Sequence, residues 1–258
     1  YNLRGYQEMS EKEQQSSEPW VFPKWHNRIP LIFFGVVGPI ATILVIAGVW
    51  YYFSPRYTDV GYRPEQPVAY SHKLHAGELG IDCRYCHTGA EGSAHARVPP
   101  TQTCMNCHTR IKTESPKLQV VRESWIEDKP IEWVRIHKTP DYAYFEHSAH
   151  VQAGVGCESC HGRIDQMVEV SLSEPLNMGW CLDCHRAPEN HLRPTSEVTT
   201  MGYVEKQHAA HVAKMEDKGA VSAFTVEDMR AHLAQTVGTK IKEEKGVNPP
   251  QHCSGCHR

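Results

Sequence analysis

The placement of cysteine constrains this 258-residue chain more than any other feature. All ten cysteines fall into five Cys-x-x-Cys-His motifs, and none is left over. Two cysteines at this spacing can form two thioether bonds to one haem, and the histidine that follows then lies under the iron as its proximal ligand. The motifs therefore predict five covalently attached haem c groups. The predicted attachment and proximal residues are Cys83, Cys86 and His87; Cys104, Cys107 and His108; Cys157, Cys160 and His161; Cys181, Cys184 and His185; and Cys253, Cys256 and His257.

Disulfides and zinc ribbons are the alternative interpretations of these cysteines. A disulfide framework does not require a histidine after every second cysteine, and a zinc ribbon pairs two Cys-x-x-Cys knuckles without needing that histidine. Five concordant motifs favour covalent haem. Haem of this type is attached outside the cytoplasm, so we expect everything from about Asp59 onward to lie there.

Composition agrees with a fold that is supported by cofactors. The hydrophobic fraction is only 40%, and part of it lies in one block near the N-terminus. A chain with so few core residues needs staples such as metals or cofactors, and buried porphyrins would serve. The formal net charge of -3 is close to neutral, which argues against a nucleic-acid partner.

Residues 29–53 form a run of 25 residues without a charged side chain. As a helix this run would reach about 37 Å, enough to cross a hydrocarbon core of about 30 Å. A cleaved signal peptide is the alternative, but the run is longer than a usual signal core and no small-x-small cleavage site follows it. We therefore expect one transmembrane helix.

The remaining segments are interpreted around this helix. Residues 1–28 form a polar tail and residues 54–69 a proline-rich linker. Basic residues lie on both sides of the helix, so their distribution hardly chooses an orientation. The haem motifs decide it. We expect a single-pass protein of the bacterial inner membrane with a cytoplasmic N-terminus and a periplasmic haem domain over residues 70–258.

The haem domain repeats. Residues 70–108 contain one His-x-x-His pair followed by two motifs, residues 145–185 contain the same inventory in the same order, and residues 204–258 contain a pair and one motif. Loops rich in Gly and Pro separate the motifs. The predicted fold is a transmembrane helix plus a mostly irregular and α-helical domain, class III cytochrome-like, with repeated dihaem modules.

Two inserts interrupt the repeats. The first contains Ser115 and Pro116, a helix cap and first-turn proline, and predicts a short helix over residues 117–125. In the second, Thr225 and Asp228 resemble a capping box, and an apolar face continues as far as Gly246. This second helix is interpreted as packing or as a partner surface.

The second axial ligand decides what a haem does, because an open face binds substrates whereas two protein ligands mostly restrict the haem to electron transfer. Histidines at i and i+3 lie on one side of a helical turn and can reach two different irons. The pairs predict four distal ligands, His72, His75, His147 and His150, and a fifth that is either His208 or His211.

Two further residues have open assignments. His137 could be a spare ligand or could bond a haem propionate. Met178 could be a thioether ligand that raises the reduction potential of one haem, or a packing residue. No motif departs from histidine and no catalytic pocket is indicated, so outer-sphere electron transfer along closely spaced porphyrins is the simplest mechanism.

The chain resembles the membrane-anchored pentahaem cytochrome c subunit of alternative complex III, a bacterial quinol-oxidising complex. The resemblance rests on CRYCHTGAEGS, VPPTQTCMNCH, WVRIHKTPDYAYFEHSAH, MGWCLDCHRAPE and CSGCHR and covers nearly all of residues 29–258. It implies a subunit beside an iron–sulfur protein and quinol-binding membrane subunits, in a respiratory or photosynthetic complex. Electrons would pass to a monohaem cytochrome c or a terminal oxidase. The stretch 215–250 is longer than the resemblance leads us to expect.

Three other functions fit parts of the pattern. A stand-alone quinol dehydrogenase of the anchored tetrahaem type also has one N-terminal helix, but its first haem must lie against the membrane, and here a proline-rich linker intervenes. A multihaem reductase requires one open haem. A structural anchor would need its haems only for folding.

Overall fold

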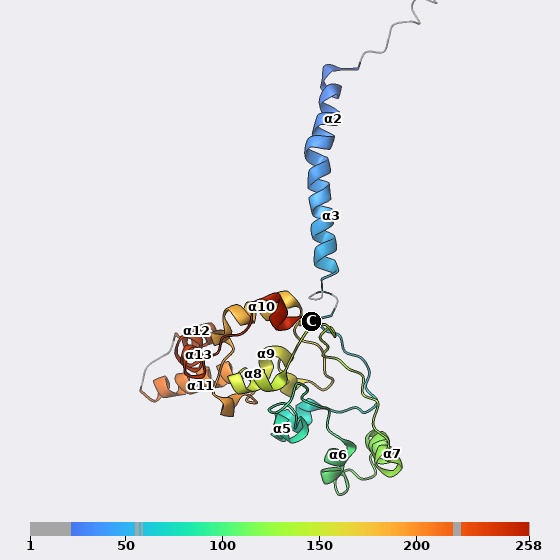
Figure 1. Cartoon of the computed structure of the whole chain (residues 1–258), viewed down its shortest axis with the longest axis vertical. Helices are drawn as coiled ribbons and strands as arrows, with labels where there is room; N and C mark the ends of the chain where they lie inside the picture. The colour runs from blue at the N-terminus through green and yellow to red at the C-terminus, as the bar shows by residue number, and fades with distance from the viewer. Residues whose placement is uncertain (1–21, 55–56, 58, 219–222, 258) are drawn as a thin grey trace, which may run out of the picture. The chain divides into compact units, whose positions relative to one another are not determined.

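The computed structural model describes residues 22–54, 57, 59–218 and 223–257. The chain divides into two units, Tyr1–Ser54 and Pro55–Arg258, and each is described by itself (Figure 1). Most of the predicted polar tail, residues 1–21, lies outside the described residues, as do residues 55, 56 and 58 of the predicted linker.

The first unit contains one apolar helix from Lys24 to Tyr52, with a mean hydropathy of 2.5 over its most apolar window and no buried residue there. It is long and apolar enough to span a membrane. The successive parts are η1 (Lys24–Asn27), α2 (Arg28–Ile32), the π-helical turn η2 (Phe33–Val37) and α3 (Gly38–Tyr52).

The helix starts at Lys24, before the charge-free run 29–53 that predicted it. Its first turns therefore include the basic residues Lys24 and Arg28. The wide turn η2 lies next to Pro39. Proline has no N–H to donate to the carbonyl four residues back and its ring crowds that carbonyl, so a locally wider turn accommodates it.

In the second unit, each Cys-x-x-Cys-His motif lies on a short helix. A helical turn brings residues i and i+3 to the same side, so the two thiols of each motif can reach one porphyrin edge. The motif helices are α5 (Cys83–Cys86), α6 (Thr101–His108), α9 (Glu158–His161), α10 (Met178–Arg186) and α14 (Cys253–Cys256).

The other elements of this unit are also short. The first His-x-x-His pair lies at the π-helical turn η3 (Lys73–Glu78) and the second on α8 (His147–Ala153). The first insert forms η4 (Pro116–Leu118) and α7 (Gln119–Glu127), close to its predicted helix. Three 3₁₀ turns and one longer helix complete the connections: η5 (Ile164–Gln166), η6 (Pro188–Asn190), η7 (Thr195–Glu197) and α11 (Tyr203–Glu216).

The described residues form no β-sheet, only isolated bridges between Ala143 and His257 and between Val155 and Leu192. Short helices joined by long irregular connections make up the domain (Figure 1). The predicted fold class, an N-terminal apolar helix and an irregular, α-helical domain, is confirmed.

The second insert forms the predicted capped helix. Thr225 and Asp228 make a capping box at the start of α12 (Val226–Leu233), which continues through the π-helical turn η8 (Ala234–Gly238) into α13 (Thr239–Lys245). The helix ends at Gly246, whose φ of 60° is the left-handed conformation that glycine tolerates. It packs on α11 and on η6, where a 2.7 Å ion pair joins Lys242 to Glu189.

Backbone hydrogen bonds join the repeat 70–108 to the repeat 145–185 in both directions. The N–H of Lys73 in the first repeat bonds the carbonyl of Met167 in the second (2.9 Å), and the N–H of His147 in the second bonds the carbonyl of Ala94 in the first (3.2 Å). At η3 the backbone approaches η5 so closely that a Cβ on Gly77 would collide with the carbonyl of Asp165. The approach requires glycine.

Buried apolar side chains are few for a unit of this size, which matches the lean composition. The large hydrophobic residues that are buried in the described part of the chain are Val68, Val121, Leu172, Leu192, Val198, Met201, Tyr203, Met229 and Ile241. Leu172 and Leu192 border the space among the later motifs, and the carbonyl of Val198 accepts the N–H of Cys157.

Candidate functional site

Each histidine of the two His-x-x-His pairs lies across from a different motif histidine. The pair members therefore diverge to separate partners. The distances between ring centroids are 6.5 Å for His72 and His87, 6.3 Å for His75 and His108, 6.4 Å for His147 and His161, and 6.2 Å for His150 and His185.

This spacing suits one metal ion between two imidazoles. A bond from a metal to an imidazole nitrogen is about 2 Å long, and the ring centre lies roughly 1 Å behind that nitrogen, so two axial rings have centroids roughly 6 Å apart. All four observed distances agree. The centroid distances are those expected for two histidines that bind one haem iron from opposite faces.

The ring orientations repeat between the two modules. The first histidine of each pair is nearly parallel to its partner ring, with interplanar angles of 2° for His72 and 11° for His147. The second histidine is rotated, by 65° for His75 and 36° for His150. The two repeats seen in the sequence thus also share the orientations of their paired imidazole rings.

An aromatic ring two residues before each pair supports both histidines. Tyr70 meets His72 edge-on at 86° and stacks on His75 at 22°. Phe145 does the same in the second module, at 85° to His147 and 28° to His150. The aromatic side chain helps to orient the two imidazoles.

Six of the eight imidazoles also donate Nδ1–H to a backbone carbonyl. The proton position is assigned from these bonds, and it leaves Nε2 as the unprotonated nitrogen that can bind iron. The bonds are His75 to Ser71 (2.9 Å), His87 to Arg97 (2.7 Å), His108 to Ile111 (3.0 Å), His147 to Ala94 (2.8 Å), His150 to Glu146 (2.7 Å) and His185 to Pro250 (2.7 Å).

Burial keeps several of these imidazoles neutral, as iron binding needs. Burial, followed by repulsion from neighbouring imidazoles, lowers the pKa of His72 to about 4 and that of His161 to about 3. Burial also lowers the pKa of His150. At neutral pH these rings therefore carry no charge and keep a lone pair for a metal.

Neighbouring thiols show how the motifs follow one another in space. Before haem attachment, contact with Cys83 and then burial raise the pKa of Cys157, so the first and third motifs meet. Burial and then Cys104 raise the pKa of Cys86, which joins the first motif to the second.

The fourth and fifth motifs extend this row. Burial and then Cys184 raise the pKa of Cys160, which joins the third motif to the fourth. Burial and then Cys256 raise the pKa of Cys181, which joins the fourth motif to the fifth. The spatial order is therefore second, first, third, fourth, fifth, in one continuous series.

Two cavities of about 1090 and 1150 Å³ lie among the later motifs. Cys181, Cys184 and Cys256 line both of them, and the first also reaches Cys253 and His257. Protein pockets for small ligands are typically about 300–1,000 Å³. The cavities thus offer the space that porphyrins need where the core is thin.

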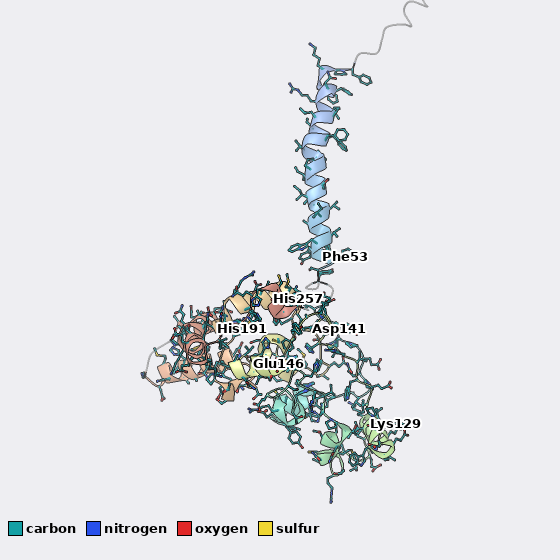
Figure 2. The ribbon with its side chains drawn as sticks, in the orientation of Figure 1. Phe53, Lys129, Asp141, Glu146, His191 and His257 are labelled. Atoms are coloured by element: carbon teal, nitrogen blue, oxygen red, sulfur yellow. The ribbon has the colours of Figure 1, made fainter. Side chains whose placement is uncertain are left out.

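The fifth motif is fastened to the fourth. The carbonyl of Pro250 accepts the Nδ1–H of His185, and the carbonyl of Cys256 accepts the N–H of Tyr144 at 2.7 Å. The ring of His257 meets that of Tyr142 with centroids 5.8 Å apart, a contact at a tilt of 33°. Figure 2 labels His257 within the helical body of this unit.

His208 and His211 lie elsewhere. The Nε2 of His208 donates to the carbonyl of Phe224 (2.8 Å), and the ring of His211 packs on that of Phe224 at 5.1 Å. Of the residues that the structure describes, neither of these histidines lines a cavity at Cys253 and His257. The assignment of His208 or His211 to the fifth haem therefore stays a prediction.

Other potential ligands do lie beside the fifth motif. Met178, His191 and His252 line the same cavity as Cys253 and His257. Met178 is 63% exposed, so it is not the buried packing residue that the sequence allowed as an alternative. Nothing in the spacing of His191 relates it to a motif. Only the chain path brings it here.

His137 lies beside an axial imidazole rather than across from one. Its ring centroid is 4.3 Å from that of His161, with an interplanar angle of 69°, which is too close for an iron to lie between the rings. Its Nε2 is buried without a hydrogen-bond partner among the described residues.

A membrane-anchored multihaem c-type cytochrome is the class of protein that this helix, these motifs and these imidazole pairs define. No protein-family model matches the chain. It is 31% identical over 183 residues to the multihaem cytochrome c subunit of a menaquinone reductase from Nitratidesulfovibrio vulgaris (strain Hildenborough), a match that covers 68% of this chain and 82% of that protein. The chain belongs to this family of multihaem cytochrome c subunits.

Proposed function

We propose that this protein carries five covalently bound haems and serves as the electron-transfer subunit of a membrane-bound, quinone-linked oxidoreductase complex. The observation that carries the proposal is the set of four imidazole pairs with centroids 6.2–6.5 Å apart, in a continuous series of motifs. The relative from N. vulgaris, a menaquinone reductase subunit, supports the quinone partner.

Bound haem supplies a one-electron carrier. The chain's own residues determine what that carrier can do. Imidazoles on both faces of the first four sites close them to substrates, which favours electron transfer over catalysis. Nδ1–H bonds to backbone carbonyls make the ligand nitrogens more basic and hold the rings in place.

The fifth site differs from the other four. In the proposal, its second axial ligand would come from the side chains that line its cavity, of which Met178, His191 and His252 are the candidates. A thioether ligand would raise the reduction potential of this site above those with two imidazoles. The end of the series would then be the natural electron sink.

The finer proposal follows the resemblance to alternative complex III. In it, the N-terminus is cytoplasmic, the haem domain is periplasmic, and an iron–sulfur subunit and quinol-binding membrane subunits deliver electrons from quinol. A monohaem cytochrome c or a terminal oxidase accepts them. The relative's name favours a second candidate in which electrons run the other way, towards menaquinone.

Intact mass spectrometry and electron paramagnetic resonance (EPR) test the haem proposal. We expect the mature chain to carry the added mass of five haems and its ferric spectrum to be low-spin throughout. A stoichiometric high-spin signal would favour the reductase with one open haem. Four haems would contradict the assignment of all five motifs.

Purification in a mild detergent tests the complex. We expect an iron–sulfur protein and polytopic membrane subunits to co-purify with the chain. Anaerobic addition of menaquinol, or of a reduced periplasmic donor with menaquinone, then determines the direction of electron flow. A chain that purifies alone in every detergent would contradict the proposal of a complex.

A further inference from the structure

Two of the eight paired imidazoles lack the Nδ1–H bond that the other six make. The Nδ1 atoms of His72 and His161 are both buried, and neither has a hydrogen-bond partner among the described residues. A metal-bound histidine almost always donates its other ring N–H to an acceptor, because the bond fixes the ring and raises the basicity of the ligand nitrogen. These two positions therefore need an explanation.

The internal repeat shows what is missing. In the first module, the loop after His87 supplies two carbonyls: Arg97 accepts from His87 itself, and Ala94 accepts from His147 of the other module. By repeat symmetry, the loop after His161 should serve His161 and His72. These are the two histidines without a bond.

The second loop cannot supply those carbonyls because it follows another path. At Gly162 the backbone turns with φ 61° and ψ -160°, and it continues directly into the tight turn η5. The carbonyl of Met167 in this loop is used by the N–H of Lys73. The loop thus clasps η3 instead of capping the two imidazoles.

His137 occupies the neighbourhood that the loop leaves open. It comes from the insert between the modules, and its ring contacts that of His161 at 4.3 Å. Its Nε2 is the third buried ring nitrogen without a partner in this region. Iron on Nε2 of His161 would leave the proton on Nδ1, which makes that atom a donor. The Nε2 of His137 is an acceptor in the tautomer that carries its proton on Nδ1.

We propose that His137 is a positioning residue for the third haem site, where its Nε2 accepts the Nδ1–H of His161 in place of the backbone carbonyl used elsewhere. The rings already touch, with centroids 4.3 Å apart. A linear N–H···N bond needs centroids roughly 5 Å apart, so the bond forms when the His137 side chain moves back by roughly 1 Å and its ring turns about the soft χ2 torsion. The inference rests on the proposed haem ligation by His147 and His161. Its consequence is a third haem whose ferric state is stabilised by a side chain.

Two substitutions separate this role from simple packing. His137→Phe keeps the ring and removes the acceptor, whereas His137→Gln offers an amide oxygen that can accept the same bond. His232→Phe, at an exposed histidine that lines neither cavity, is the control. The full-length, haem-loaded chain is used in each case, and mass spectrometry confirms five haems before any other measurement.

The readouts are a spectroelectrochemical titration and the g-values of the ferric EPR spectrum. In His137→Phe we expect the midpoint potential of one haem to rise. The expected change in its oxidation equilibrium is about tenfold, the low end of the effects of outer-shell partners. For one electron this corresponds to about 59 mV. The g-values of one haem should change with it. His137→Gln should remain close to the parent, and His232→Phe should match it.

The inference is overturned if His137→Phe carries five haems with unchanged potentials and g-values, or if His137→Gln shifts as far as His137→Phe. If His137→Phe fails to load its third motif, His137→Gln decides: full loading with parental potentials supports the inference, and loss of the same haem overturns it. A parent chain without haem would instead contradict the proposed function.

Discussion

Single histidines in this protein have separate tasks even when they are neighbours in sequence. His147 and His150 lie on one turn of α8, yet their rings face His161 and His185 respectively. In the proposed function, a histidine pair therefore joins two adjacent haem sites and does not close a single one. The same holds for the pair at η3.

Replacing His147 or His150 with Ala should damage one haem each, and not the same haem. Loss of one axial imidazole opens one face of a single iron, so each variant should show one new high-spin signal in EPR. The double variant should show two. His232→Ala, at an exposed histidine that lines neither cavity, is the control. Identical spectral losses from the two single variants would contradict the divergent pairing.

Asp82 gives the first motif helix a pH-dependent support. Its carboxylate accepts the N–H of Arg84 at the start of α5, pairs with the Arg84 guanidinium at 2.8 Å, and accepts the hydroxyl of Thr199. Hydrogen bonds from the Arg84 side chain are the main cause that lowers the pKa of Asp82 from 3.8 to about 2.

This shift predicts where the support is lost. A depressed carboxyl pKa stabilises the folded state fully above the unfolded pKa, and the contribution disappears as the pH falls through about 2. Asp82→Asn should therefore lower the free energy of unfolding at pH 7, by less than about 1 kcal/mol because the pair is partly exposed. At pH 2 the variant and the parent should converge.

Denaturant unfolding at both pH values measures this difference, and Glu65→Gln, at an exposed acidic side chain, is the control. An equal loss of stability at pH 7 and pH 2 would show that Asp82 acts through its shape and not through its charge.

At the scale of elements, the close approach of η3 to η5 joins the two modules. This contact sets the distance between the first and third motifs, whose thiols meet at Cys83 and Cys157. A glycine is needed at position 77 because a Cβ there would collide with the carbonyl of Asp165.

Gly77→Ala should therefore destabilise the second unit by about 1–3 kcal/mol, the usual cost of overpacking. For a unit of about 200 residues, this corresponds to a decrease in the unfolding temperature of about 2–4 °C per kcal/mol. Gly92→Ala is the matched control, because a Cβ at Gly92 would meet no atom within 4 Å. Circular dichroism measures the melting curve of each variant. Equal curves for Gly77→Ala and Gly92→Ala would contradict the close approach of η3 to η5.

At the scale of the whole molecule, the chain combines a helix long enough to span a membrane with a second unit in which each motif has thiols near those of another motif. In the proposed function, the paired imidazoles leave the first four sites without an open coordination position for a substrate, so we expect the chemistry on quinone to take place in another subunit.

The isolated chain should consequently show no steady turnover with menaquinol and an artificial acceptor, whereas the intact complex should. Stopped-flow reduction of the isolated chain by dithionite confirms that its haems are redox-active. Sustained menaquinol oxidation by the chain alone would favour the stand-alone quinol dehydrogenase. Matched haem concentrations make the two samples comparable.

Much of the candidate site could be predicted from local patterns. The attachment residues follow from the spacing within a five-residue motif, and the distal candidates His72, His75, His147 and His150 follow from spacing within one turn. The capped helix at Thr225 follows from a four-residue signature. The fifth site could not be predicted in this way, because His191 and Met178 reach Cys253 only through the path of the chain.

The sequence by itself determined the number and kind of the motifs, the membrane helix and the histidines available as ligands, because covalent geometry and hydrophobic length act within a few residues or one helix. The tertiary structure alone decided which imidazole faces which, the spatial order of the motifs, and the position of His137 beside His161. Those relations join segments far apart in the chain. They depend on how the two modules pack against each other, which no pattern within a few residues predicts.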